Sequence, residues 1–363
     1  MTLSSNADGQ KPLVSLLIVA HRCEPYIDET LQSLTEQTYP HWEALVVDGG
    51  SPDNVADKVL RWQAIDSRIH FFHTPDYGVN AARNHAARNS HGEYLMVLDG
   101  DDRLAPEYLK TCISAFDNPT VKASLCQWQF FGSNIPQSYL RYTGYEDLLM
   151  MNSIHVTTMV RRDDYFRIGG FDENRSLLLD DWDFWIRLLD GEPDGALAMN
   201  PAPLFLYRRR PGSRLSKMDN PAIRSDFQKY MYRKHGQRYH RHFGNVVTPQ
   251  MIGYVPAKNI RLLMEPTGKN NVTSLTESIL YACKGCALSL FPAESQDAYL
   301  DAAADKLRPM IDKALPHMSH ADRNIALLLM TDRKRFIAKV RRREALRGPV
   351  RALWHRICRC LSH

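Results

Sequence analysis

Short apolar runs alternate with longer amphipathic segments over the first 130 residues of the chain. We expect a buried strand at each of five runs, which are rich in branched or aromatic residues: 14–20, 42–48, 68–72, 93–99 and 121–131. Between the runs, apolar residues recur at helical spacing, as in Ile27, Leu31 and Leu34. Strands separated by helices of this length predict an α/β fold, in which helices cover a mostly parallel sheet on both faces.

This alternation ends after residue 200, where the pattern becomes mainly helical. We therefore predict four regions along the chain: a flexible N-terminal tail at 1–11, an α/β domain at 12–215, an α-helical domain at 216–330 and a basic amphipathic tail at 331–363. Ligands of a parallel sheet bind beyond the carboxyl ends of its strands. Asp48 and Asp99 each end a predicted strand, which makes both candidates for a binding site.

The composition is that of a globular protein. The chain has 363 residues, of which 44% are hydrophobic and 24% charged, and this balance excludes wholesale disorder. The apolar run at 13–20 is far shorter than the roughly 20 residues that a membrane-spanning helix needs. The first twelve residues lack the apolar core of a signal peptide. The seven cysteines are irregularly spaced, so we expect a reducing, cytoplasmic location.

Positive charge is concentrated at the C-terminus. The net charge is +5, yet residues 331–363 hold eleven Lys and Arg against two acids, so the rest of the chain is mildly acidic. This distribution is not that of a nucleic-acid-binding protein, and we expect no nucleic acid partner. Cations mixed with apolar residues favour a helix lying on an anionic membrane surface. The alternatives are a solvated charged face and a nucleic-acid contact that would weaken steeply with salt.

The most specific local motif is Asp99-Gly100-Asp101-Asp102, directly after a predicted strand. Hard divalent cations prefer oxygen ligands, and Mg²⁺ commonly takes one or two carboxylates plus substrate phosphates. An acidic turn with a glycine therefore suits a metal ion that bridges to a diphosphate. The alternative is a solvated turn, in which Asp and Gly are common for conformational reasons.

A second acidic pair, Asp180 and Asp181, precedes a predicted apolar helix. Carboxylates at a helix start can cap backbone N–H groups and are stabilised by the helix dipole. A carboxylate held at such a position could equally serve as a general base. Both interpretations remain open from the residues alone.

Four segments together resemble the family-2 inverting glycosyltransferases with the A-type fold. They are VSLLIVAHRCEPYIDETLQSL, LVVDGGSPDNV, GVNAARNHAARNSHGEYLMVLDGDD and GGFDE followed by DDWDFWIRLL, and they span roughly residues 12 to 215. The resemblance implies a Rossmann-like, nucleotide-sugar-binding catalytic domain. It also implies transfer of a sugar from a donor, usually uridine-linked, to an acceptor hydroxyl with inversion at the anomeric carbon.

The resemblance carries donor and metal contacts onto particular residues. Asp48 matches the acid that contacts the nucleotide, and Arg83 and Asn84 match an Ala-Arg-Asn element near the donor. Asp99 and Asp101 match the pair of acids that holds Mg²⁺ or Mn²⁺, with Asp101 the more direct ligand and Asp99 nearer the ribose.

The resemblance also assigns the catalytic base. Asp181 matches the second acid of the family's Glu-Asp pair, which removes the acceptor proton, and Asp180 replaces the Glu. The family's Pro-Val-Tyr-Asn reads Val19-Ala20-His21-Arg22 here, and the second Asp of its Asp-Asp-Gly-Ser reads Gly49. These departures concern the contacts with base and ribose, and hence the identity of the donor nucleotide.

A basic segment at 206–217, LYRRRPGSRLSK, holds five cations and no acid. We expect it to be a mobile loop that closes over the diphosphate, with Arg208 and Ser213 as the contacts. The alternative is a solvated turn at the edge of the domain.

The predicted activity is a metal-dependent glycosyltransferase of polysaccharide or glycolipid biosynthesis, acting on a saccharide or lipid-linked acceptor at the cytoplasmic face of the membrane. One rival is a sugar-nucleotide pyrophosphorylase, which would need a Gly- and Arg-rich loop after the first strand. The AHRCEPY segment found there has no glycine. The other is a catalytically inactive, membrane-associated scaffold of the same fold.

Overall fold

The computed structural model describes most of the first 253 residues and shorter stretches beyond them. The described residues are 11–134, 136–174, 179–210, 220–244, 247–253, 257, 260, 308, 312, 315–317, 320–332, 334–336, 338 and 342. The chain divides into two compact units. One comprises residues 1–148 and 152–220, and the other comprises residues 149–151 and 221–363.

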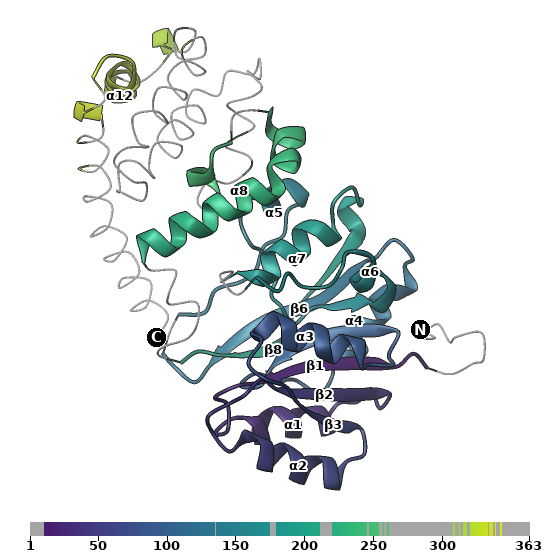
Figure 1. Cartoon of the computed structure of the whole chain (residues 1–363). Coiled ribbons are helices and arrows are strands. Elements are labelled where there is room, and N and C mark those ends of the chain that lie inside the picture. Colours follow the sequence, from purple (N-terminus) through teal and green to yellow (C-terminus); the bar gives the residue numbers. More distant parts are fainter. Residues whose placement is uncertain are drawn as a thin grey trace, which may run out of the picture. The chain divides into compact units, whose positions relative to one another are not determined.

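The first unit is built on one eight-stranded sheet, with the strand order β3-β2-β1-β4-β7-β6-β8-β5 (Figure 1). Four strands form its parallel half: β1 (Val14–Ala20), β2 (Trp42–Asp48), β3 (Ile69–His73) and β4 (Tyr94–Asp99). Every residue of β1 and β2 is buried, as expected for parallel strands covered on both faces. The sequence pattern predicted both of these strands with the observed bounds.

The other half of the sheet is mixed. It contains β5 (Arg103–Leu104), β6 (Ala123–Phe131), β7 (Met159–Arg161) and β8 (Leu197–Arg208). β7 is antiparallel to β4 and β6, and β8 runs parallel to β6 and antiparallel to β5. Only β6 was expected from the sequence. β8 carries Pro201 and Pro203 and is largely half-exposed, so it lacks the continuous apolar run of a buried strand.

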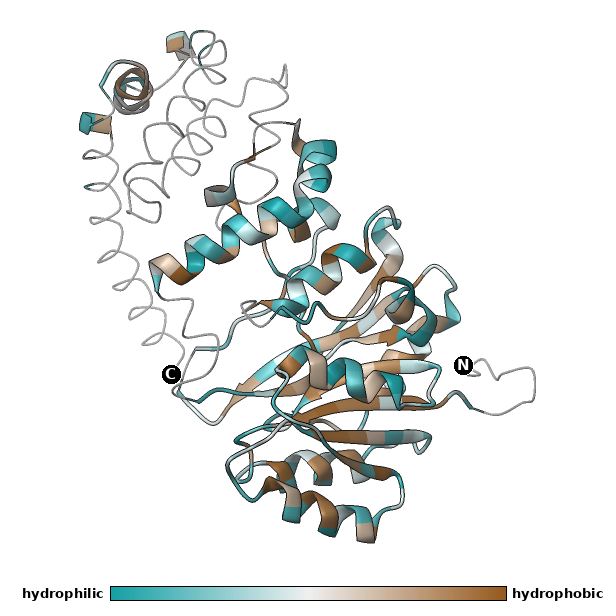
Figure 2. Cartoon of the chain, in the orientation of Figure 1, coloured by the Kyte–Doolittle hydropathy of each residue, from teal (hydrophilic) through white to brown (hydrophobic). Residues whose placement is uncertain are grey.

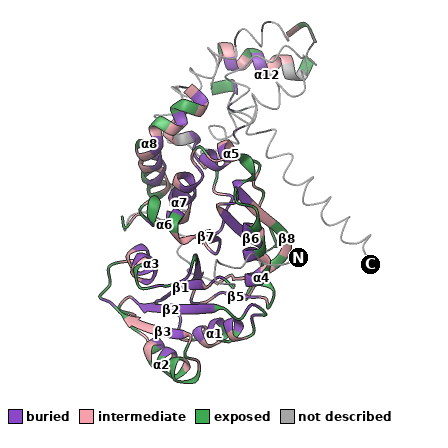
Figure 3. Cartoon of the chain, turned by 90° about the vertical axis from the view of Figure 1, so that its right-hand side faces the viewer, coloured by how far each residue is buried: buried purple, intermediate pink, exposed green. Residues whose placement is uncertain are grey.

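Helices cover both faces of the sheet, which confirms the expected α/β class. One face packs against α1 (Ile27–Thr35), α2 (Val55–Ile65) and α4 (Tyr108–Ser114) through residues such as Leu16 and Ile18. The other face carries α3 (Val79–Arg88), α6 (Arg162–Arg167) and α7 (Asp180–Leu188) (Figure 3). Coloured by hydropathy, the central strands are largely hydrophobic, whereas the helices carry both hydrophobic and hydrophilic residues (Figure 2).

The second unit contains α8 (Pro221–Phe243) and α12 (His320–Thr331). α8 lies within the stretch 216–330 that was expected to be helical, and α12 ends one residue beyond it. It is tied to residues 149–151, because Tyr239 Oη donates to the Leu149 carbonyl at 3.0 Å and Gly253 N donates to the Met150 carbonyl at 2.6 Å. α5 (Tyr145–Met150) runs into this connection. In the part of the chain that the structure describes, no helix has the length and apolarity to cross a bilayer. Most of the predicted tail at 331–363 lies outside the described residues.

Candidate active site

The candidate acids meet at the carboxyl end of the parallel strands. β1 lies between β2 and β4, with Ala20 in register with Asp48 on one side and Val19 with Asp99 on the other. β3 adds His73, which is in register with Asp48. Parallel strands therefore bring residues far apart in the sequence to one edge of the sheet, as expected for a ligand site.

The turn after β4 is fixed by close packing at Gly100. A Cβ atom at this position would lie 2.8 Å from Cys23 Sγ and 3.1 Å from the Val19 carbonyl oxygen, so no larger residue fits without movement. Asp102 N donates to the Asp99 carbonyl at 3.0 Å and closes the turn. The glycine predicted from the motif thus has a steric reason.

The three acids of this turn have different environments. Asp101 forms an ion pair with Arg210, with 2.8 Å between Asp101 Oδ2 and Arg210 Nε. Burial raises the pKa of Asp101, and the neighbouring Asp99 carboxylate raises it further. Asp102 is buried and accepts a hydrogen bond from Arg208 N at 2.8 Å. Its Oδ2 atom has no hydrogen-bond partner among the residues described here.

Arg83 joins the acidic turn to the start of α7. Its guanidinium lies 3.1 Å from Asp99 Oδ1 through Nη2 and 2.8 Å from Asp180 Oδ2 through Nη1. Burial alone would lower the pKa of Arg83, but the Asp180 and Asp99 carboxylates raise it above its ordinary value. One buried cation therefore holds together two acidic groups that are remote in the sequence.

The pKa of Asp181 is raised towards neutrality. Burial raises its pKa to about 7, and the adjacent Asp180 carboxylate adds to this shift. The Asn152 amide, which donates to Asp181 Oδ2 at 3.1 Å, and the Arg83 guanidinium act in the opposite direction. The helix N-cap is Leu179 and makes no side-chain cap hydrogen bond, so neither acid occupies that capping position.

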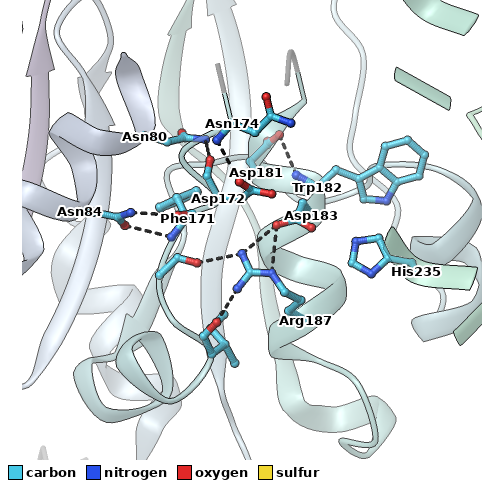
Figure 4. Close-up of polar contacts among 12 residues, drawn as sticks. Asn80, Asn84, Phe171, Asp172, Asn174, Asp181, Trp182, Asp183, Arg187 and His235 are labelled. Carbon is cyan, nitrogen blue, oxygen red and sulfur yellow. Dashed lines mark hydrogen bonds and ion pairs between the residues drawn. The ribbon is translucent and has the colours of Figure 1, made fainter. Parts of the chain in front are cut away.

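A loop before α7 is held by the side chain of Asn84 (Figure 4). Asn84 Oδ1 accepts from Phe171 N at 2.9 Å and from Tyr165 Oη at 2.6 Å. Its Nδ2 donates to the Phe171 carbonyl and to Glu173 Oε1, both at 2.9 Å. These four bonds use the full hydrogen-bonding capacity of an asparagine amide. Asn84 therefore shapes the loop that precedes Asp180 and Asp181.

The same close-up shows how α7 is anchored (Figure 4). Arg187 forms a buried ion pair with Asp183, at 2.8 Å, and also donates to the carbonyls of Ile168 and Gly170. Asn80 Nδ2 donates to the Asp172 carbonyl at 2.5 Å. The first turn of α7, which carries Asp181, is thus fixed against the loop at 168–172.

The basic segment differs in part from the expected mobile loop. Its residues 206–208 belong to β8, and Arg208 is fixed there, with its Nε donating to the Asp101 carbonyl and its Nη2 to Glu29, both at 2.8 Å. Arg208 therefore supports the acidic turn. Ser213, the other predicted contact, lies outside the described residues.

Asp99 and Asp101 suit a hard divalent cation. One oxygen of each carboxylate forms an ion pair, Asp99 Oδ1 with Arg83 and Asp101 Oδ2 with Arg210. The other oxygen of each carboxylate lies outside these ion pairs. In the described part of the chain, no group of three or more His, Cys, Asp or Glu side chains is placed to hold an ion alone. Two carboxylates fit a Mg²⁺-type ion that completes its shell with water and phosphate oxygens.

Three residues of this edge were not predicted from the sequence: Asn152, His73 and Arg210. Asn152 follows a helix with no motif around it, and His73 is an ordinary strand end by sequence. Arg210 lies within the basic segment, where the sequence favoured Arg208 instead. The fold places Asn152 beside Asp181, His73 beside Asp48 and Arg210 beside Asp101.

The chain matches a known family model over part of its length. Residues 15–184 match the model described as glycosyl transferase family 2. TuaG of Bacillus subtilis (strain 168), a glycosyltransferase assigned to teichuronic acid biosynthesis, is 36% identical over 101 residues. That alignment covers 28% of this chain and 40% of TuaG.

Two solved structures share the fold. Staphylococcus aureus TarS (residues 1–349), crystallised with UDP-GlcNAc, has a TM-score of 0.54 at 18% identity, covering 91% of this chain and 89% of that one. The mannosyltransferase PcManGT of Pyrobaculum calidifontis, crystallised with GDP-Man and Mn²⁺, has a TM-score of 0.50 at 19% identity. It covers 81% of this chain and 86% of that one. The first-unit fold is thus of the A-type glycosyltransferase class.

Proposed function

Since the chain belongs to glycosyl transferase family 2, we propose that it transfers a sugar from a nucleotide-sugar donor to an acceptor hydroxyl, with inversion at the anomeric carbon. A uridine-linked donor is the first candidate, and the biosynthesis of a polysaccharide or glycolipid is the proposed context. The TuaG likeness supports the polysaccharide context, and the TarS complex with UDP-GlcNAc supports the choice of donor.

The observation that carries this proposal is the bridge made by Arg83. It connects Asp99, at the proposed donor-binding turn, with Asp180, which directly precedes the proposed base. A transferase needs a site for the departing diphosphate beside a group that takes the acceptor proton. The buried Arg83 side chain links the acids that we propose for these two roles.

The proposed reaction uses Asp181 as a general base. The acceptor oxygen forms a bond to the anomeric carbon as the bond from that carbon to the diphosphate oxygen breaks. The proton of the acceptor hydroxyl passes to the Asp181 carboxylate, and the diphosphate departs with the bonding electrons. The pKa of Asp181, about 7, matches proton transfer near neutral pH.

Asp99 and Asp101 are the residues proposed to hold Mg²⁺ or Mn²⁺. When bound, the ion would supply positive charge that stabilises the departing diphosphate. Arg210 and Arg208 both contact Asp101, and Arg210 is the cation we propose to contact the diphosphate directly. The membrane association of residues 331–363 remains a prediction.

Calorimetric titration with UDP, CDP, GDP and ADP, with and without Mn²⁺, tests the proposal. We expect micromolar binding of one diphosphate that disappears when the metal is chelated. Asp181→Asn should retain this binding within a few fold and lose sugar transfer. No binding of any nucleoside diphosphate would contradict a transferase and favour the inactive scaffold.

A further inference from the structure

The two units of the chain carry opposite net charge. The first unit holds 30 Asp and Glu against 21 Lys and Arg, a net charge of −9, whereas the second holds 25 Lys and Arg against 11 acids, a net charge of +14. Residues 331–363 contribute +9 of the latter, and α8 contributes +5 from six cations and the single acid Asp226. Of the described helices of the second unit, α8 therefore carries the positive charge.

Half of the six cations of α8 lie on its exposed face. The exposed residues of this helix recur mostly at every third or fourth position, as Ala222, Ile223, Asp226, Lys229, Arg233, Gln237, His240 and Arg241. This is the period of an α-helix, so these residues share one face. We call this surface, with Lys229, Arg233 and Arg241, the basic face of α8. At 1.5 Å per residue, the three cations extend over about 18 Å.

The acid on this face offsets little of its charge. Asp226 Oδ1 lies 3.9 Å from Lys229 Nζ, and both side chains are more than half exposed. An exposed pair at this distance is weak. Arg233 forms no ion pair within the part of the chain that the structure describes. The basic face can therefore attract an anionic ligand.

The basic face has little of the apolar surface that a membrane-bound helix needs. Helices that lie in the plane of a bilayer bury a broad apolar face among the lipids. In α8, the apolar side chains of Phe227, Met231 and Phe243 are buried within the protein, and Ile223 is the large apolar residue that is exposed. Much of α8 is accordingly hydrophilic (Figure 2). A water-soluble polyanion fits this face better than a bilayer does.

We propose that the basic face of α8 binds an acidic polysaccharide, the acceptor that the enzyme extends; this inference rests on the proposed function. A helical turn and a sugar unit are of similar length, so acidic groups along a saccharide chain can meet successive cations of the face. Half-exposed Tyr230, next to Lys229, offers a ring against which a sugar can pack. The acidic first unit repels such a chain, and binding at α8 offsets this repulsion and raises the local concentration of acceptor.

Binding of an oligogalacturonate long enough to span the basic face tests this assignment, with the full-length protein in calorimetry at low salt and without donor. The triple variant Lys229→Gln, Arg233→Gln, Arg241→Gln should bind on the order of 10- to 100-fold more weakly, because each exposed ion pair contributes about two- to fivefold. Lys11→Gln, Arg61→Gln, Lys110→Gln removes the same charge from exposed positions of the first unit and is the matched control. Its affinity should stay within about twofold of wild type, since distant exposed charges are screened.

Arg233 alone supplies a second test, which changes the fold least. Arg233→Gln should weaken binding of the oligogalacturonate by about two- to fivefold. Arg233→Lys keeps the charge and should retain wild-type affinity.

Absence of binding by the wild-type protein, unchanged binding by the triple variant, or an equal loss in the control would each overturn the inference. A triple variant that loses affinity for phosphatidylglycerol vesicles or for an oligothymidylate, but not for the oligogalacturonate, would assign the face to a membrane or a nucleic acid instead. Binding of UDP with Mn²⁺ is the separate readout of the proposed function. Its absence would reject that function, whereas loss of the saccharide alone would reject only the role of α8.

Discussion

Replacement of Asp181 by Asn tests two properties of this acid separately: its effect on the free energy of unfolding and its proposed role as the general base. In the folded protein the pKa of Asp181 is about 7, against an ordinary value of 3.8. A carboxyl group with a raised pKa stabilises the fold only while it is protonated. Its contribution is complete below the ordinary value and is lost as the pH rises through the folded-state pKa.

The size of the effect follows from this window. Between pH 5.5 and 7 the wild-type protein should lose about 1.36 kcal/mol per pH unit through this group, or about 2 kcal/mol. The side chain keeps partial exposure, and solvent screening reduces the figure to about 1 kcal/mol. Asp181→Asn removes the ionisation, so its advantage over wild type should grow by this amount between pH 5.5 and pH 8.

Urea unfolding at both pH values, followed by tryptophan fluorescence, measures this difference. Asp163→Asn removes an exposed carboxyl group from α6 and serves as the control, for which we expect no comparable pH-dependent change. Sugar transfer by Asp181→Asn should be lost at both pH values. Transfer near the wild-type rate would refute the base assignment, and a pH-independent stability difference would refute the raised pKa.

Further substitutions test the turn, the loop and the tail. Gly170→Ala should cost on the order of 3 kcal/mol in urea unfolding, because its Cβ would lie 2.6 Å from Asn84 Oδ1 at a positive φ. Gly169→Ala, with positive φ and no atom within 4 Å, should cost about 1 kcal/mol, and equal costs would refute the steric argument. Arg83→Gln should destabilise by on the order of 3 kcal/mol in the same assay, since it breaks the buried ion pair with Asp180 and the partly exposed one with Asp99, and an unchanged midpoint would argue against these contacts. Asp101→Ala should abolish the enhancement of UDP binding by Mn²⁺ in calorimetry, and retained enhancement would remove Asp101 as a ligand. Deletion of 331–363 should release the protein from sedimenting anionic vesicles, and a truncated chain that still pellets would show that the tail is not the anchor.

The parallel half of the sheet was predictable because its strands are buried on both faces. Such strands must be continuously apolar, and β1 and β2 are therefore visible in the sequence with their observed bounds. β8 is half-exposed and contains two prolines, so its pattern resembles a loop, although pairing with β6 makes it a strand. The position of Arg208 at the end of a strand followed from that pairing alone.

The candidate site was predictable as a set of acids but not as a network. Motif spacing identified Asp99, Asp101 and Asp181, because their types and order carry the resemblance. The partners of the acids come from long-range packing, as in the contact of Asp101 with Arg210 and that of Asp180 with Arg83, which spans 97 residues. Local patterns cannot encode such pairs, and the engagement of Asp48 by His73 was invisible for the same reason.

The bridge made by Arg83 also has a kinetic consequence. Its contact with Asp99 closes a short loop of 16 residues, whereas its contact with Asp180 in α7 closes a loop of 97 residues. Closing long loops delays folding, because chain entropy is lost before the contacts form. During refolding, helical circular dichroism should therefore recover before activity. Activity would then report the formation of this long-range contact in the first unit.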